Sequence, residues 1–114
     1  MQRLDLKNRK AMSLDKRSAI ENARIYAQLV GEQLNPYKIV LFGSFAKGTS
    51  NDNSDIDIAV IVKTIEGDFL EISKRLNKLT RDIDNRIEPV LLQLENDQSG
   101  FLSTILKTGI TLYN

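Results

Sequence analysis

Two pairs of residues in this 114-residue sequence are of types, and at spacings, that could bind a phosphorylated substrate. Gly43 and Ser44 are adjacent, and Asp55 and Asp57 follow after ten intervening residues, two positions apart. Side chains two positions apart on a strand point to the same face, so both carboxylates could aim at one point. A divalent cation would relieve their mutual repulsion, and two Mg²⁺ ions about 3.5–4 Å apart would suit phosphoryl chemistry there.

The Asp-x-Asp pattern also has a purely structural interpretation. Asp57 could cap the end of a strand or pair with an arginine. It lies, however, in the apolar segment 56–62, where an unpaired negative charge is costly. For this pattern alone, both interpretations remain open.

The Gly-Ser pair adds a second kind of chemistry. Gly43 ends a short apolar segment and has no Cβ, so a phosphate could approach its backbone. Ser44 would begin a helical turn, where exposed N–H groups favour anions. Its hydroxyl could donate to a phosphate oxygen, and Lys47 could balance the charge of a polyphosphate. A plain strand-to-helix turn explains the dipeptide alone, but its combination with the aspartate pair favours a phosphate-binding site.

Two better-known motifs are excluded by single positions. The segment 43–50 begins like a P-loop, but Thr49 stands where that loop requires lysine. The segment 53–64 begins like an EF-hand loop, but Ile58 stands where that loop requires glycine.

Composition excludes several other classes of protein. The sequence contains no cysteine and no histidine, which excludes disulfides, thiol nucleophiles and histidine-based triads. Its 16 basic and 15 acidic residues give a net charge of +1, which argues against nucleic-acid binding through bulk charge.

The N-terminal part of the chain is more basic than the rest. Residues 1–24 carry a net charge of +4, either as a solvated face or as a docking surface for an acidic partner. Charges scattered from Arg3 to Arg24 predict that no signal peptide is present, and the aliphatic run Ile58–Val62 is too short to span a membrane. We therefore expect a cytoplasmic protein that contacts neither membrane nor nucleic acid directly.

The surrounding pattern predicts a single domain, 1–114, in which helices and strands alternate. An amphipathic helix is expected over 14–34, with Ser13 as its N-cap and Asn35-Pro36 as its stop, and a second one over 69–83. Strands are expected over 37–42, 56–62 and 87–94, with a polar loop over 48–54. A short helix over 101–107 is followed by a break at Gly109 and an apolar end. The order predicts an α/β or α+β fold, with a small mixed β-sheet and flanking helices.

The motif Gly43-Ser44-x₁₀-Asp55-x-Asp57 resembles the signature of the nucleotidyltransferase superfamily that includes DNA polymerase β and kanamycin nucleotidyltransferase. In size the chain is similar to the minimal nucleotidyltransferases of prokaryotes. The resemblance implies a polymerase β-like fold, a short mixed sheet with helices on one side. It also implies transfer of a nucleoside monophosphate, with ATP as the expected substrate and two Mg²⁺ ions as cofactors, and release of pyrophosphate.

The resemblance also implies a third carboxylate on the next strand. Glu88 is the candidate, although the family more often has aspartate there, and Pro89 favours the alternative of an exposed residue on an edge strand. The residues expected to carry the chemistry are, for catalysis and metal binding, Asp55, Asp57 and Glu88 and, for nucleotide binding, Gly43, Ser44 and Lys47.

Minimal nucleotidyltransferases commonly occur beside a HEPN-type ribonuclease toxin, so the resemblance implies an antitoxin that adenylylates such a toxin. Two other functions remain open. The chain could be a binding module that neutralises a partner by contact, or a transferase for a small molecule such as an aminoglycoside.

Overall fold

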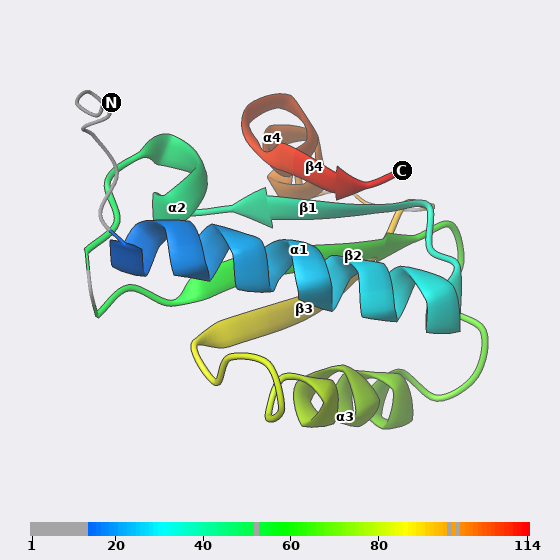
Figure 1. The fold of residues 1–114 in the computed structure, drawn as a ribbon. Coiled ribbons are helices and arrows are strands. Elements are labelled where there is room, and N and C mark those ends of the chain that lie inside the picture. The colour runs from blue at the N-terminus through cyan, green and yellow to red at the C-terminus, as the bar shows by residue number, and fades with distance from the viewer. Residues whose placement is uncertain (1–13, 52, 96, 98) are drawn as a thin grey trace.

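A four-stranded mixed sheet with helices on both faces organises the computed structural model, which describes residues 14–51, 53–95, 97 and 99–114 (Figure 1). The elements in chain order are α1 (Leu14–Leu34), β1 (Lys38–Phe42), α2 (Ser44–Lys47), β2 (Ile56–Val62), α3 (Phe69–Leu79), β3 (Ile87–Gln93), α4 (Phe101–Thr108) and β4 (Ile110–Tyr113). The strand order is β3-β2-β1-β4; β1 is antiparallel to β2 and β4, and β2 is parallel to β3. The prediction of an α+β fold with a small mixed sheet is confirmed.

The position of β2 inside the sheet, with both of its faces covered, explains why nearly all of its residues are apolar. Ile58 and Val60 belong to the core between the sheet and the helices α1 and α3, whereas Ala59 and Ile61 pack with α4 on the opposite face. Successive side chains of a strand point to opposite faces, so both faces of β2 need apolar residues. The expectation that helices cover one side alone is wrong, because α4 covers part of the second face.

Helix α1 begins and ends where its sequence predicts. Ala23, Ala27 and Val30 are buried on the face that packs against the sheet. Asn35 then adopts a positive φ of 49° and its N–H donates to the carbonyl of Gly31 at 2.9 Å, which ends the helix. The expected N-cap, Ser13, lies outside the described residues. Within those residues, none of the helices is long and apolar enough to cross a membrane.

The predicted second helix is too long by four residues. Helix α3 ends at Leu79, where Thr80 N–H donates to the carbonyl of Asn77 at 3.2 Å and its hydroxyl to the same carbonyl at 2.7 Å. These short-range bonds tighten the last turn and stop the helix. Ile83 still packs against the core from the following turn, so the apolar spacing continues past the end of the helix.

A hydrogen-bonded turn before β3 fixes where that strand begins. Asp84 accepts hydrogen bonds from Asn22 of α1 at 3.1 Å and from Arg86 Nη2 at 2.8 Å. The carbonyl of Arg86 in turn accepts from the N–H of Ile56 at 2.9 Å. The first residues of β2 and β3 are therefore held side by side, and the register that follows pairs Asp57 with Glu88.

We expect Asp84→Asn to destabilise the fold. The side-chain hydrogen bonds from Arg86 lower the pKa of Asp84 from 3.8 to about 2, against the opposing effect of burial. Because the folded-state pKa lies below the unfolded value, this stabilisation is complete above about pH 4 and is lost as the pH falls through about 2. Urea unfolding should show a loss of about 2 kcal/mol at pH 7, shrinking towards pH 2. The exposed Asp82→Asn is the control, and an equal loss at every pH would contradict the prediction.

Candidate active site

The turn between β1 and α2 brings the two halves of the motif together. Gly43 has φ 74° and ψ −150°, a conformation that other residues rarely adopt, and α2 starts directly after it. A Cβ placed on Gly43 would collide with the carboxylate oxygen Oδ2 of Asp57. Glycine is thus required here both by the backbone angle and by the space that Asp57 occupies. The burial of Phe45 fixes α2 against the rest of the domain.

Asp57 and Glu88 are neighbours on adjacent parallel strands. Their α-carbons are register partners, and neighbouring strands lie about 4.8 Å apart. Asp57 alternates with Ile56 and Ile58, which face α1 and α3, so it lies on the α4 face of the sheet, and its partner Glu88 shares that face. Asp55 precedes β2 and is exposed, as is Glu88, whereas Asp57 is half-buried.

The electrostatics of this end of the sheet are unfavourable for three negative charges. Burial raises the pKa of Asp57, and the nearby charges of Asp55 and Glu88 raise it further. Asp55 and Glu88 are therefore each close enough to Asp57 to repel its charged form. In this setting an oxygen-ligated cation would stabilise the charged form of Asp57.

Asp55, Asp57 and Glu88 offer oxygen ligands of the kind that Mg²⁺ binds, although they do not form a preformed metal site. Within the described ranges, no three acidic residues are grouped closely enough to hold a metal ion as they stand. Asp55 and Glu88 are exposed, and exposed side chains change rotamer on the picosecond-to-nanosecond scale, so both could turn towards Asp57. Carboxylate oxygens are the ligands that Mg²⁺ prefers.

All six residues predicted from the sequence lie at one end of the sheet. Gly43 and Asp57 are brought into direct proximity, and Glu88 lies beside Asp57. Ser44 is the first residue of α2 and is half-buried, and Lys47 is its last residue and is exposed. Both therefore lie close to the turn at Gly43. Their roles in phosphate binding remain predictions.

Sequence reasoning missed two aromatic residues beside the carboxylates. Phe42, the last residue of β1, is the cross-strand partner of Asp57. Phe101, the first residue of α4, packs edge-on against it, with ring centroids 5.8 Å apart and an interplanar angle of 85°. The position of Phe42 next to Gly43 was the available signal; nothing in the sequence pairs it with Phe101.

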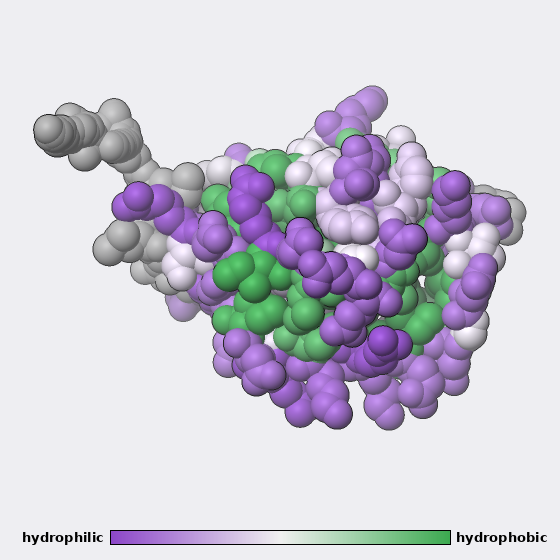
Figure 2. Space-filling view, turned by 45° about the vertical axis from the view of Figure 1, so that its right-hand side comes forward, coloured by the Kyte–Doolittle hydropathy of each residue, from purple (hydrophilic) through white to green (hydrophobic). Residues whose placement is uncertain are grey.

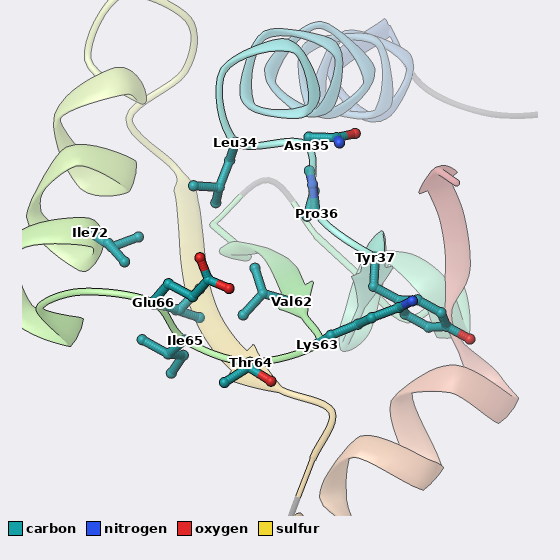
Figure 3. Close-up of a pocket in the computed structure, with 11 residues that line it drawn as sticks. Leu34, Asn35, Pro36, Tyr37, Val62, Lys63, Thr64, Ile65, Glu66 and Ile72 are labelled. Carbon is teal, nitrogen blue, oxygen red and sulfur yellow. The ribbon is translucent and has the colours of Figure 1, made fainter.

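A sizeable hollow lies elsewhere, at the opposite end of the sheet. It has a volume of about 580 Å³ and is lined by residues from the α1–β1 and β2–α3 connections (Figure 3). Leu34, Val62 and Ile72 point into it in this view. Figure 2 shows apolar side chains among hydrophilic ones on this side of the molecule, together with a hollow. None of the predicted site residues lines this hollow.

The turn at Gly43 lies against the Asp57 carboxylate at one end of the mixed sheet, which is the arrangement expected of a nucleotidyltransferase domain. Residues 25–114 match the family model described as Polymerase beta, Nucleotidyltransferase. Because the match spans most of its length, the chain belongs to this family. Comparison with functionally curated proteins finds no match.

Two solved structures share the fold. A candidate nucleotidyltransferase from Sulfolobus solfataricus superposes with a TM-score of 0.60 at 21% identity, over 89% of this chain and 88% of that one. A structure described as a toxin-antitoxin with AMP-PNP superposes with a TM-score of 0.55 at 25% identity, over 89% of this chain and 74% of the other. The first supports the fold, and the second is similar to this chain in sequence as well.

Proposed function

We propose that this protein transfers AMP from ATP to a protein acceptor in a Mg²⁺-dependent reaction, and that the acceptor is a HEPN-type ribonuclease toxin for which the chain serves as antitoxin. The observation that carries the proposal is the close approach of Gly43 to the Asp57 carboxylate, which joins the glycine-serine turn to the acidic strand. Family membership supports the transfer reaction. The similarity to a toxin-antitoxin structure with AMP-PNP supports both the adenine nucleotide and the protein partner.

The candidate site residues would have separate roles in binding the metal and the nucleotide. Asp55, Asp57 and Glu88 would hold Mg²⁺, which when bound would neutralise charge on the phosphates. Gly43 would let the triphosphate approach the backbone, while Ser44 would donate a hydrogen bond to it.

The chemical step needs little covalent work from the protein. Glu88, exposed on the edge strand β3, would take the proton from the attacking hydroxyl of the acceptor. The acceptor oxygen then bonds to the α-phosphorus, and the bond to the departing pyrophosphate breaks. Positioning and charge stabilisation would supply most of the rate enhancement.

Incubation with α-labelled ATP, Mg²⁺ and either a purified HEPN-type protein or a cell lysate tests the proposal. Label on the HEPN-type protein, lost when Asp57 is changed, is the expected result. A labelled small molecule would instead indicate the aminoglycoside type of transferase. Inhibition of the toxin without any label would indicate a module that acts by contact alone.

Changes on α2 should weaken nucleotide binding more than they slow the chemistry. We expect Ser44→Ala and Lys47→Ala each to cost roughly 1–3 kcal/mol of ATP affinity, because each removes a group expected to contact charged phosphate oxygens. Those charges are present before reaction, so KM should rise at least as much as kcat falls. Isothermal titration measures the affinity, with the distant Lys63→Ala as control. Unchanged ATP binding in both variants would place the phosphates elsewhere.

A further inference from the structure

An aromatic pair lies beside the candidate metal ligands, on the same face of the sheet. Phe42 and Asp57 are directly opposite each other on antiparallel strands, so their side chains share the α4 face. Phe101 packs edge-on against Phe42 with centroids 5.8 Å apart. Residues far apart in the sequence are thus neighbours in turn, Asp57 with Phe42 and Phe42 with Phe101 at the start of α4.

Phe101 is held in place while much of its surface stays open. The residue is 45% exposed, although a phenylalanine is ordinarily among the more buried residues. The core contacts of α4 come from Leu102 and Ile105, which are only 3% and 2% exposed. The helix is therefore docked by these two residues, and the ring of Phe101 remains partly available to a ligand.

The spacing of Asp57, Phe42 and Phe101 suits a nucleotide. Directly opposite residues have β-carbons about 5 Å apart, and the Phe101 ring is the next neighbour of the Phe42 ring, so the Phe101 ring lies no more than roughly 15 Å from the β-carbon of Asp57. In a nucleotide the sugar separates the base from the α-phosphate. Phe42 directly precedes Gly43, so a base attached to a triphosphate at Gly43 could reach the exposed ring of Phe101.

We propose that Phe101 stacks on the nucleobase of the bound nucleotide, with Phe42 holding its ring; the inference rests on the proposed function. Stacking of a base on an aromatic side chain tolerates any base, because every base has a π-face. Phe101 thus contributes affinity for the nucleoside part without selecting strongly among bases. The phosphates are bound separately, by the turn at Gly43.

The decisive experiment compares ATP with inorganic tripolyphosphate, which carries the same chain of phosphates but no base. Binding of each is measured by titration calorimetry with Mg²⁺. Phe101→Ala should weaken ATP binding roughly 5- to 150-fold, the usual range for one stacked base, and leave tripolyphosphate binding unchanged. Phe101→Tyr keeps the ring and should bind ATP like the parent. Leu106→Ala, an exposed apolar residue of the same helix, is the matched control.

A direct optical signal comes from Phe101→Trp, because the sequence contains no tryptophan. The single indole should change its fluorescence when ATP, GTP or UTP binds, and should not respond to tripolyphosphate. No response to any nucleotide at saturating concentration would contradict the stacking.

The outcomes separate this inference from the function on which it rests. If the parent protein binds neither ATP nor tripolyphosphate, the proposed function fails and the stacking fails with it. If ATP binds equally well to the parent and to Phe101→Ala, the stacking is wrong while the function stands. If Phe101→Ala binds ATP normally but no longer labels the acceptor, the ring contacts the acceptor, which also overturns the proposal. Equal loss of both ligands would indicate damage to the phosphate site instead of stacking.

Discussion

The double variant Asp55→Asn with Asp57→Asn should transfer no label to any acceptor and should still fold. Both changes keep the size and hydrogen-bonding capacity of the side chain while removing the charge that Mg²⁺ requires. The charge of Asp55 raises the pKa of Asp57, so the two repel in the free protein. Neutralising them should leave the free energy of unfolding equal or slightly higher. Label transfer and urea unfolding measure the two expectations independently.

The acidic pair can be tested one residue at a time. Asp57 is half-buried and lies against Gly43, so Asp57→Asn should be the more damaging single change, and Asp55→Asn the less damaging one. The exposed Asp82→Asn serves as the control for loss of one negative charge. Full transfer by the double variant would show that these aspartates hold no metal.

Local sequence pattern was enough to predict the elements that position the site. The nearly continuous apolar run 56–62 predicts a strand, with Asp57 as its polar exception, and β2 is that strand. Gly43 between an apolar strand and a polar turn predicts the entry into α2. In both cases the decisive constraint acts within a few residues, so it can be read from the sequence.

Features that depend on strand register could not be predicted in this way. The pairing of Asp57 with both Phe42 and Glu88 follows from the alignment of three strands, which is set by distant contacts such as Asn22 with Asp84. The sequence 101–108 has apolar spacing typical of a short helix, but nothing in it indicates which face of the sheet that helix covers. Placing Phe101 against Phe42, the strand partner of Asp57, therefore required the structure.

Glu88→Gln should leave ATP binding nearly unchanged and lower the rate of transfer roughly 10²-fold or more, the scale for loss of a general base. Glu88 lies beside Asp57 on the same face, yet on the edge strand β3 and exposed, on the side from which an acceptor could approach. The nucleotide depends on Asp57 and on the turn at Gly43, neither of which the change touches. Single-turnover transfer and calorimetric ATP binding separate the two effects.

Glu88→Asp is the sharper control for this position. It restores the residue expected more often in the family and keeps the charge, so substantial transfer should survive despite a reach shorter by one methylene. Pro89 has no N–H to donate and lies opposite Ile58, as suits an edge strand, so neither change should disturb the pairing of β3 with β2. If Glu88→Gln transfers label as fast as the parent, Glu88 is an exposed edge residue and the proton goes to another base. If Glu88→Gln is inactive and Glu88→Asp is active, the reaction requires a negative charge at this position and not merely a side chain of similar shape.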